Sequence, residues 1–444
     1  MPVAALLLVL AALFQQTPAP VPDDSTQTPT EEAVEVLDQA SDVVSEEGTY
    51  DEDSDESGPG IQFRPRIAPS ALYSSGRGVG LGGGVGIRNL VRDGTDLVLD
   101  VRVQQRFQSV DATFFSADPY DSHLHGLVNA GGSTTQRRRY YGLGPNTVAD
   151  SELNLYHDAA QAEVRLGYYP LGTTAIYLQP GVRFLYDYSG GVNLDASENG
   201  LDAVFGPGSP SNEAVRVAQG EGRYGASVGL EIATDLRDWP AYARRGFFGT
   251  AEARRFFAFD ASELTLARYS ASGLGYLPIR GRTTLIVRGV VAVTRSGDAN
   301  GDGEDDAIPF YYLPTLDDRV ATAFRQDRLT GRDLLAGGIG VRAPVVDLLG
   351  IYGIDMLVMG YLGNAYDNVF EQFTPRVSFE EGSYRDPDTG RASLRPALGI
   401  GLGIVNLDKE RVVVGGLIGI GPGGVSLATL RIAYDLRDAR PLFR

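Results

Sequence analysis

The chain has 444 residues, with 56 glycines, 22 tyrosines and no cysteine, a composition that favours β-structure with many tight turns and excludes a disulfide-held fold. The net charge of −18 is uneven, because fourteen of the 57 acidic residues lie between residues 21 and 60, where there is no lysine or arginine. The other 43 acidic residues accompany 39 basic ones, so the rest of the chain is nearly neutral. This charge distribution excludes nucleic acid as a partner.

The N-terminus carries an apolar run of twelve residues, Val3–Phe14. A bilayer span needs about twenty apolar residues, so this run predicts the core of a signal peptide over residues 1–19. Residues 20–60 are rich in acidic residues, Pro, Ser and Thr, and cannot bury enough apolar surface to offset the entropy of ordering. They predict a disordered acidic linker, which is either a periplasmic tether or a plain spacer.

Residues 61–444 consist of segments with alternating polarity, separated by Gly, Pro, Asp and Asn. A period of two places the apolar and polar side chains on opposite faces of a sheet. A soluble sandwich also alternates, but here the polar face keeps Arg with Asp or Glu, as a wet lumen would. At about 24 residues per strand and connection, the sequence predicts an all-β fold, a transmembrane antiparallel β-barrel of about sixteen strands, with fourteen as the alternative. The clearest alternating segments are residues 95–104, 174–187, 282–294 and 425–436.

The stretch 319–346 joins a basic, polar half to an alternating strand. In the strand, Leu335, Ile339 and Val341 fall on one face, and Gly338, Gly340 and Arg342 on the other. A long basic loop that leads into a strand with one apolar face is typical of a membrane barrel, in which the loop can fold back into the lumen.

The same stretch resembles the sixth loop of the Omp85 superfamily of outer-membrane barrels, also called surface antigen D15 and including the BamA/TamA proteins. The matching residues are those of a lumen loop: Phe324, Arg325, Arg328, Gly331 and Asp333. The Arg-Gly pair of that family falls on Thr322 and Ala323, and neither residue matches. Two further segments resemble motifs of the family's barrels; their residues are Tyr141, Gly142, Gly144 and Asn146, and Asp235, Arg237 and Asp238.

The resemblance implies a barrel in the cell outer membrane that aids the insertion or transport of polypeptides. We expect it to lack the family's periplasmic POTRA repeats, because the roughly forty residues of the acidic linker are too few to hold one such domain. Its implied partners are outer-membrane lipid and client polypeptides or a periplasmic adaptor. A lumen loop cannot leave its arginines unpaired, so we expect Arg328 to pair with a wall carboxylate. By alternation the candidates are Glu252, Glu163 and Asp235. The alternative function is a passive pore or a structural barrel.

One acidic segment fits the D-x-[DN]-x-[DN]-G pattern of a calcium loop, in which alternate oxygens surround the ion. Its candidate ligands are Asp298, Asn300, Asp302, Glu304 and Asp306. The twelfth position, which a bidentate Glu would fill, is Pro309, so the alternative is a solvated loop tip. The sequence contains no G-x-S-x-G, H-E-x-x-H or Walker motif, and we expect no enzyme activity and no cofactor other than this Ca²⁺.

Overall fold

The computed structural model describes residues 65–74, 77–88, 90, 95–116, 123–168, 176–194, 197, 199–220, 222–238, 242–260, 262–298, 306–316, 323–324, 327–348, 351–407, 411–421 and 424–433. The predicted signal peptide (1–19) and acidic linker (20–60) lie outside these residues. The chain divides into residues 1–57 and a compact unit of residues 58–444, and the second unit contains all of the described residues. Among the described residues, no helix has both the length and the apolar character that a membrane crossing requires.

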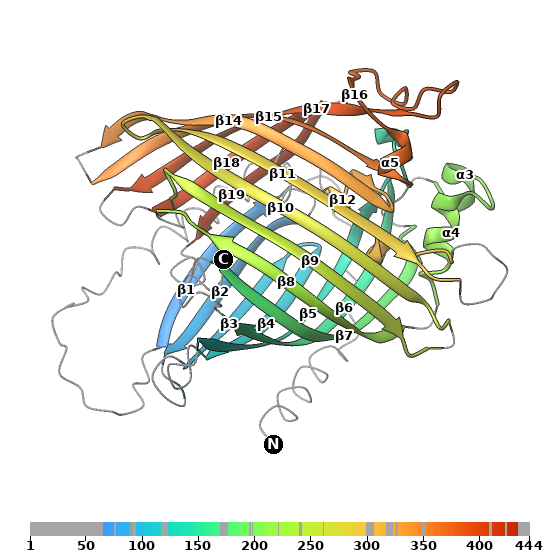
Figure 1. Cartoon of the computed structure of the whole chain (residues 1–444), viewed down its shortest axis with the longest axis horizontal. Helices are drawn as coiled ribbons and strands as arrows, with labels where there is room; N and C mark the ends of the chain where they lie inside the picture. The colour runs from blue at the N-terminus through green and yellow to red at the C-terminus, as the bar shows by residue number, and fades with distance from the viewer. Residues whose placement is uncertain are drawn as a thin grey trace. The chain divides into compact units, whose positions relative to one another are not determined.

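Sixteen strands form a closed antiparallel barrel (Figure 1). Each strand pairs with the next along the chain, and the last pairs back to the first, so the predicted barrel and its strand number are confirmed. In order the strands are β1 (Pro65–Ser74), β2 (Gly78–Arg88), β3 (Thr95–Gln104), β4 (Phe107–Ser116), β5 (Leu124–Tyr140), β6 (Leu153–Tyr168), β7 (Ile176–Val192), β8 (Arg223–Asp235), β9 (Gly246–Ala258), β10 (Thr265–Arg280), β11 (Thr283–Ser296), β14 (Asp333–Leu348), β15 (Tyr352–Tyr366), β17 (Ala392–Asn406), β18 (Arg411–Gly421) and β19 (Gly424–Ala433).

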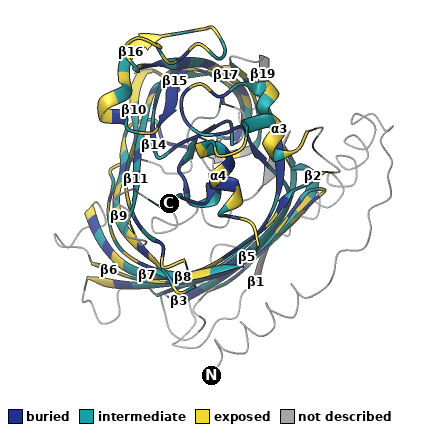
Figure 2. Ribbon diagram, turned by 90° about the vertical axis from the view of Figure 1, so that its right-hand side faces the viewer, coloured by how far each residue is buried: buried dark blue, intermediate teal, exposed yellow. Residues whose placement is uncertain are grey.

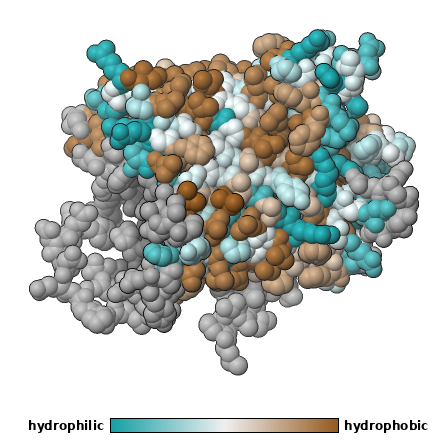
Figure 3. All heavy atoms as spheres, in the orientation of Figure 1, coloured by the Kyte–Doolittle hydropathy of each residue, from teal (hydrophilic) through white to brown (hydrophobic). Residues whose placement is uncertain are grey.

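The alternation in the sequence determines which side chains face outward. In β7, Phe184 is 54% exposed and Val182 38%, whereas Gln179 and Asp187 on the other face are 7% exposed. Strands β3 and β8 repeat this pattern, so apolar side chains form the outer surface of the barrel. Figure 3 shows hydrophobic side chains gathered over the strands of one face, with hydrophilic ones mainly toward its ends. A closed ladder with an apolar exterior satisfies every backbone group in lipid.

The connections differ between the two ends of the barrel. At one end they are short, such as the pair Gly281 and Arg282 between β10 and β11. At the other end lie the β5–β6 loop (141–152), the β7–β8 loop (193–222), the β11–β14 loop (297–332) and the β15–β17 loop (367–391). Long loops mark the extracellular end of such barrels and short turns the periplasmic end.

The long loops carry the remaining elements: η1 (Ala149–Ser151), α3 (Leu201–Phe205), α4 (Pro210–Arg216), η2 (Phe310–Tyr312), β12 (Thr315–Leu316), β13 (Leu329–Thr330), α5 (Val369–Gln372) and β16 (Phe373–Val377). Seen from the loop end, α4 lies within the ring of strands (Figure 2). Its buried residues pack with η2 and with Tyr140, Leu155 and Phe256 of the wall. The long loops therefore fold over and into the extracellular end of the lumen.

Candidate functional site

The described part of the β11–β14 loop lies inside the barrel. Its residues Leu316, Ala323, Phe324 and Leu329 are at most 3% exposed. They pack against inward-facing residues of four strands, and together these form the loop cluster: Ile286, Ala292, Leu334, Ala336, Met359, Tyr361, Ala365 and Ala397 with the four loop residues. The loop thus fills one side of the lumen with apolar side chains.

Glycines allow the loop backbone to touch the wall. A Cβ on Gly419 of β18 would lie 2.5 Å from the carbonyl oxygen of Ala323, and a Cβ on Gly331 would lie 2.8 Å from that of Tyr366. Backbone atoms cannot move aside as a flexible side chain can, so any larger residue would push the loop away from β15 or β18.

Arg328 anchors this loop to the extracellular end. Its Nη1 donates to Thr147 Oγ1 at 3.0 Å, and its Nη2 donates to Thr147 O at 3.2 Å and to Glu381 Oε1 at 2.6 Å. The guanidinium also stacks on Tyr141, 4.9 Å from the ring centroid. Burial lowers the pKa of the Arg328 guanidinium, an effect that the nearby Glu381 carboxylate opposes. Arg328 therefore joins three loops through charge-assisted bonds.

A second buried arginine, Arg395 of β17, binds the same segment from the wall. Its Nη1 donates to Thr147 O at 3.1 Å and its Nη2 to Thr147 Oγ1 at 3.2 Å, and its guanidinium lies 4.0 Å from the Tyr384 ring centroid. Sequence reasoning missed Arg395, Glu381 and Tyr384. The available signal was alternation in β17, which places Arg395 on the inward face beside Ala397 and Gly399.

The segment Tyr141–Thr147, which we call the β5–β6 motif, ends in Thr147, the residue that accepts hydrogen bonds from both arginines. Gly142 and Gly144 have φ of +91° and +82°, which turn the chain after β5. The Gly144 amide then donates to Thr330 O of the β11–β14 loop at 2.9 Å. Asn146 Oδ1 accepts from the Arg385 amide at 2.6 Å, and Tyr141 OH donates to Glu152 Oε2 at 2.7 Å. The structure thus brings the β5–β6 motif into contact with the loop that carries Phe324, Arg328 and Gly331.

The prediction that Arg328 pairs with a carboxylate of the wall is wrong. Glu163 and Glu252 pair with arginines of the strands, and Asp235 pairs with Arg237 two residues further along, whereas Arg328 meets Glu381 of another loop. The physical reason is position: Arg328 lies at the extracellular mouth, where loop carboxylates are nearer than those of the wall. Asp333, which is fully buried, instead accepts from Arg295 Nη2 and from the amide of Val369, both at 2.9 Å.

The Asp235-Arg237-Asp238 motif forms the β8–β9 turn (236–245) at the periplasmic end. Asp235 and Arg237 form two hydrogen bonds of 2.9 Å, and Asp238 Oδ1 accepts from the amides of Arg244 at 3.0 Å and Arg245 at 3.1 Å.

The same turn reaches across the periplasmic end of the barrel to β14 and β15. Tyr242 OH donates to Asp355 of β15, and Arg342 of β14 stacks on the Tyr242 ring at 3.8 Å. Burial raises the pKa of Tyr242 to about 12, and the hydrogen bond to Asp355 acts in the same direction. The turn is therefore fixed to the inward faces of β14 and β15 at the periplasmic end.

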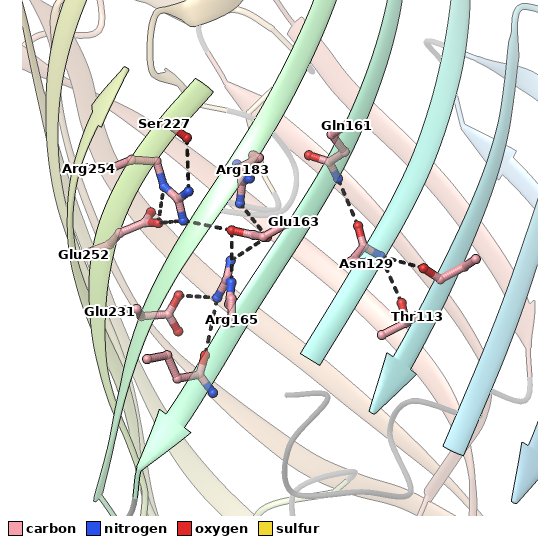
Figure 4. A network of polar contacts seen from close by, with 12 residues as sticks. Thr113, Asn129, Gln161, Glu163, Arg165, Arg183, Ser227, Glu231, Glu252 and Arg254 are labelled. Carbon is pink, nitrogen blue, oxygen red and sulfur yellow. Dashed lines mark hydrogen bonds and ion pairs between the residues drawn. The ribbon is translucent and has the colours of Figure 1, made fainter. Parts of the chain in front are cut away.

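The lumen wall formed by β6 to β9 carries a network of charges (Figure 4). Glu163 accepts from Arg183 Nη2 at 3.1 Å and from Arg254 Nη2 at 3.0 Å. Arg165 Nε also contacts Glu163 at 3.1 Å, and Arg165 Nη1 donates to Glu231 at 2.7 Å. We call the charged wall the inward-facing set Glu163, Arg165, Arg183, Glu231, Glu252, Arg254 and Arg268.

The candidate calcium ligands are only partly described. Asn300, Asp302 and Glu304, like Arg325 of the lumen loop, lie outside the described residues. The Asp306 amide donates to Gly297 O at 2.9 Å, so the described ends of the segment lie side by side. The described residues alone contain no cluster of three metal-ligating side chains. Calcium binding here stays a prediction.

No family model and no curated protein matches this chain. Among solved structures it is similar to BamA from Haemophilus ducreyi lacking POTRA domains 1-3, with 12% identity, a TM-score of 0.59 and coverage of 84% of this chain and 70% of that one. CdiB from Acinetobacter baumannii shares 11% identity over 83% of this chain and 60% of its own, with a TM-score of 0.48. The BamA likeness confirms the predicted barrel fold.

The protein is an outer-membrane β-barrel. Its closed ladder and apolar exterior require a lipid environment. Inside this outer-membrane barrel, one half of the lumen is filled by a loop and the other is lined by charges.

Proposed function

We propose that this barrel helps insert or move polypeptides at the outer membrane through a seam between β1 and β19. One observation carries the proposal: the first and last strands close the barrel, and among the described residues β1 pairs with β19 from Ser70↔Ala433 to Ser74↔Thr429. Every other pair of neighbouring barrel strands is consecutive in the chain and is also joined by a covalent connection. The closing ladder is held by backbone hydrogen bonds of about 0.5–1.5 kcal/mol net each and by no connection, so it is the easiest one to open.

An opened seam would present two strand edges with unpaired backbone donors and acceptors. Such edges bind another extended segment by strand addition, with main-chain hydrogen bonds that do not depend on its sequence. A client strand could therefore pair with β1 or β19 while its apolar side chains face lipid. The resemblance of the lumen loop to Omp85 proteins supports the same role.

The loop cluster would keep the rest of the barrel in shape while the seam opens. Its residue Ala323 touches Gly419 of β18, the strand next to β19, and lies close to Gly399 of β17. The same packing supports the proposal over a passive pore, because a pore needs an unobstructed lumen. The proposal assigns the barrel no catalytic step.

The seam can be tested by locking it, since the chain has no native cysteine. The pairs Leu72→Cys with Arg431→Cys, and Ala71→Cys with Ile432→Cys, face each other in the ladder. Neighbouring pairs alternate between wide and close spacing, so one of the two should form a disulfide. Val101→Cys with Val110→Cys, in β3 and β4, is the matched control.

The measurement is insertion of a client outer-membrane protein into proteoliposomes that contain the barrel. We expect the oxidised seam pair to block insertion, the reductant to restore it, and the β3–β4 pair to have no effect. Unchanged insertion with a locked seam would overturn the proposal. A steady ohmic conductance that is the same with and without the seam disulfide would instead favour the passive pore. Co-purification from outer membranes would then identify a client or a periplasmic adaptor.

A further inference from the structure

Arg268 of β10 stands apart from the rest of the charged wall. Its inward direction follows from alternation, because the next residue, Tyr269, is 54% exposed on the outer face. Yet the Arg268 side chain is itself exposed, and so is Ser272, four residues further along the same face. Solvent therefore reaches these two inward-facing residues of β10.

Glu252 attracts Arg268 without forming an ion pair with it, whereas Arg183 and Arg254 repel it. The three glutamates of the wall contact Arg165, Arg183 and Arg254, which leaves Arg268 as the surplus arginine. No residue that the structure describes forms an ion pair or side-chain hydrogen bond with it. In the ladder Arg268 lies directly opposite Arg254, and like charges in this position repel each other.

A second, independent observation lies on the other neighbouring strand. Thr294 of β11 is directly opposite Arg268, is 1% exposed and has no hydrogen-bond partner for its Oγ1. Arg183 also repels Arg268. Its Nε is likewise buried without a hydrogen-bond partner. A buried donor without a partner is unfavourable, so the site holds donors that a ligand could satisfy.

We propose that Arg268, with Thr294 and Arg183, forms a lumenal subsite for an oxyanion, a carboxylate or a phosphate. The planar guanidinium of Arg268 matches the two oxygens of such a group, and a ligand held there can accept from the Thr294 hydroxyl. An anion also removes the repulsion between Arg268 and Arg254. The site is independent of the β1–β19 seam, so either proposal can fail without the other.

The test is calorimetric titration of the full chain in detergent micelles with inorganic phosphate and, separately, with a triglutamate peptide. Arg268→Gln should weaken binding by about tenfold and Thr294→Val by about threefold, because each removes a donor to the anion. Arg255→Gln, the same charge change on the outer face of β9, should leave binding unchanged.

The melting temperature separates a binding role from a structural one. Because Arg268→Gln removes a repelling charge without breaking an ion pair, it should leave the melting temperature unchanged or raise it. Binding of phosphate alone or of triglutamate alone supports the subsite and identifies its ligand. Failure of the native chain to bind either anion, or equal binding by the Arg268→Gln variant, would overturn it.

Discussion

The two halves of the lumen wall differ in the side chains that they direct into the barrel. Both are inward faces of one barrel, and both alternate with an apolar exterior. The charged wall of β6 to β10 faces a space that water reaches, and it pairs glutamates with arginines. The inward faces of β11, β14, β15 and β17 instead carry an apolar cluster where the β11–β14 loop covers them, beside buried polar residues such as Asp333 and Arg395. Apolar side chains are therefore found inside this barrel where a loop excludes water from the wall.

This difference has energetic consequences. Apolar burial does not depend on salt, whereas partly solvated ion pairs are screened by it. The loop cluster should therefore contribute stability that persists in high salt, and the charged wall stability that diminishes. Substitutions on the two sides can test this division directly.

The largest effect is expected from Phe324→Ala in the loop cluster. Phe324 is 3% exposed, and removing a buried phenyl ring costs about 3–5 kcal/mol through lost transfer energy and the cavity left behind. Phe370→Ala is the matched control, because Phe370 is 83% exposed and its loss should change stability by less than about 0.5 kcal/mol. Urea unfolding of both variants measures the difference; equal losses would mean that the cluster does not hold the loop.

A somewhat smaller effect is expected from Arg328→Ala. The substitution removes the bonds to Thr147 and leaves Glu381 without its arginine, at a cost of about 2–4 kcal/mol for bonds to charged groups. The β11–β14 loop should then be cleaved faster by trypsin added from outside. Arg328→Lys should be intermediate, because lysine has no planar fork. Arg391→Ala, an exposed arginine of the β15–β17 loop, should behave like the native chain. Unchanged cleavage in Arg328→Ala would show that the arginine does not anchor the loop.

The sequence predicted the parts of this structure that local pattern controls. Alternation placed Phe184 outward and Asp187 inward, and the strand number followed from length. The apolar interior was missed, because a period of two cannot tell whether an inward residue such as Leu334 will meet water or a loop. The contact between Arg328 and Thr147 spans 181 residues, and no local pattern specifies such a pairing. Motif resemblance selected the Thr147 and Arg328 segments, but only the fold brings them together.

On the charged wall, Glu163→Gln should have a smaller effect than either loop substitution. It keeps the side-chain shape but leaves Arg165, Arg183 and Arg254 to repel one another. The arginine side chains are 10–26% exposed, so lumenal water moderates the loss to about 1–3 kcal/mol.

Salt distinguishes this loss from that of Phe324→Ala. Urea unfolding at low and at high salt should show the Glu163→Gln deficit shrinking as the ionic strength rises, while the Phe324→Ala deficit stays constant. Glu380→Gln, an exposed loop glutamate, is the control and should be neutral. If the loss of unfolding free energy in Glu163→Gln did not change with salt, the charged wall would be as inaccessible to water as the loop cluster.

The smallest effect concerns the acidic segment Asp298–Asp306, which belongs to the same connection as the loop cluster but is hydrophilic throughout. If it binds calcium with the Kd of roughly 10⁻⁴–10⁻³ M typical of extracellular sites, about 1 mM calcium should stabilise the barrel by roughly 0.4–1.4 kcal/mol. Asp298→Asn with Asp302→Asn should abolish the gain, because neutral amides bind calcium more weakly than carboxylates do. The measurement is the melting temperature in chelator, in calcium and in magnesium. Equal melting temperatures in chelator and calcium would leave the segment as a solvated loop tip, and equal gains from both metals would indicate charge screening rather than a site.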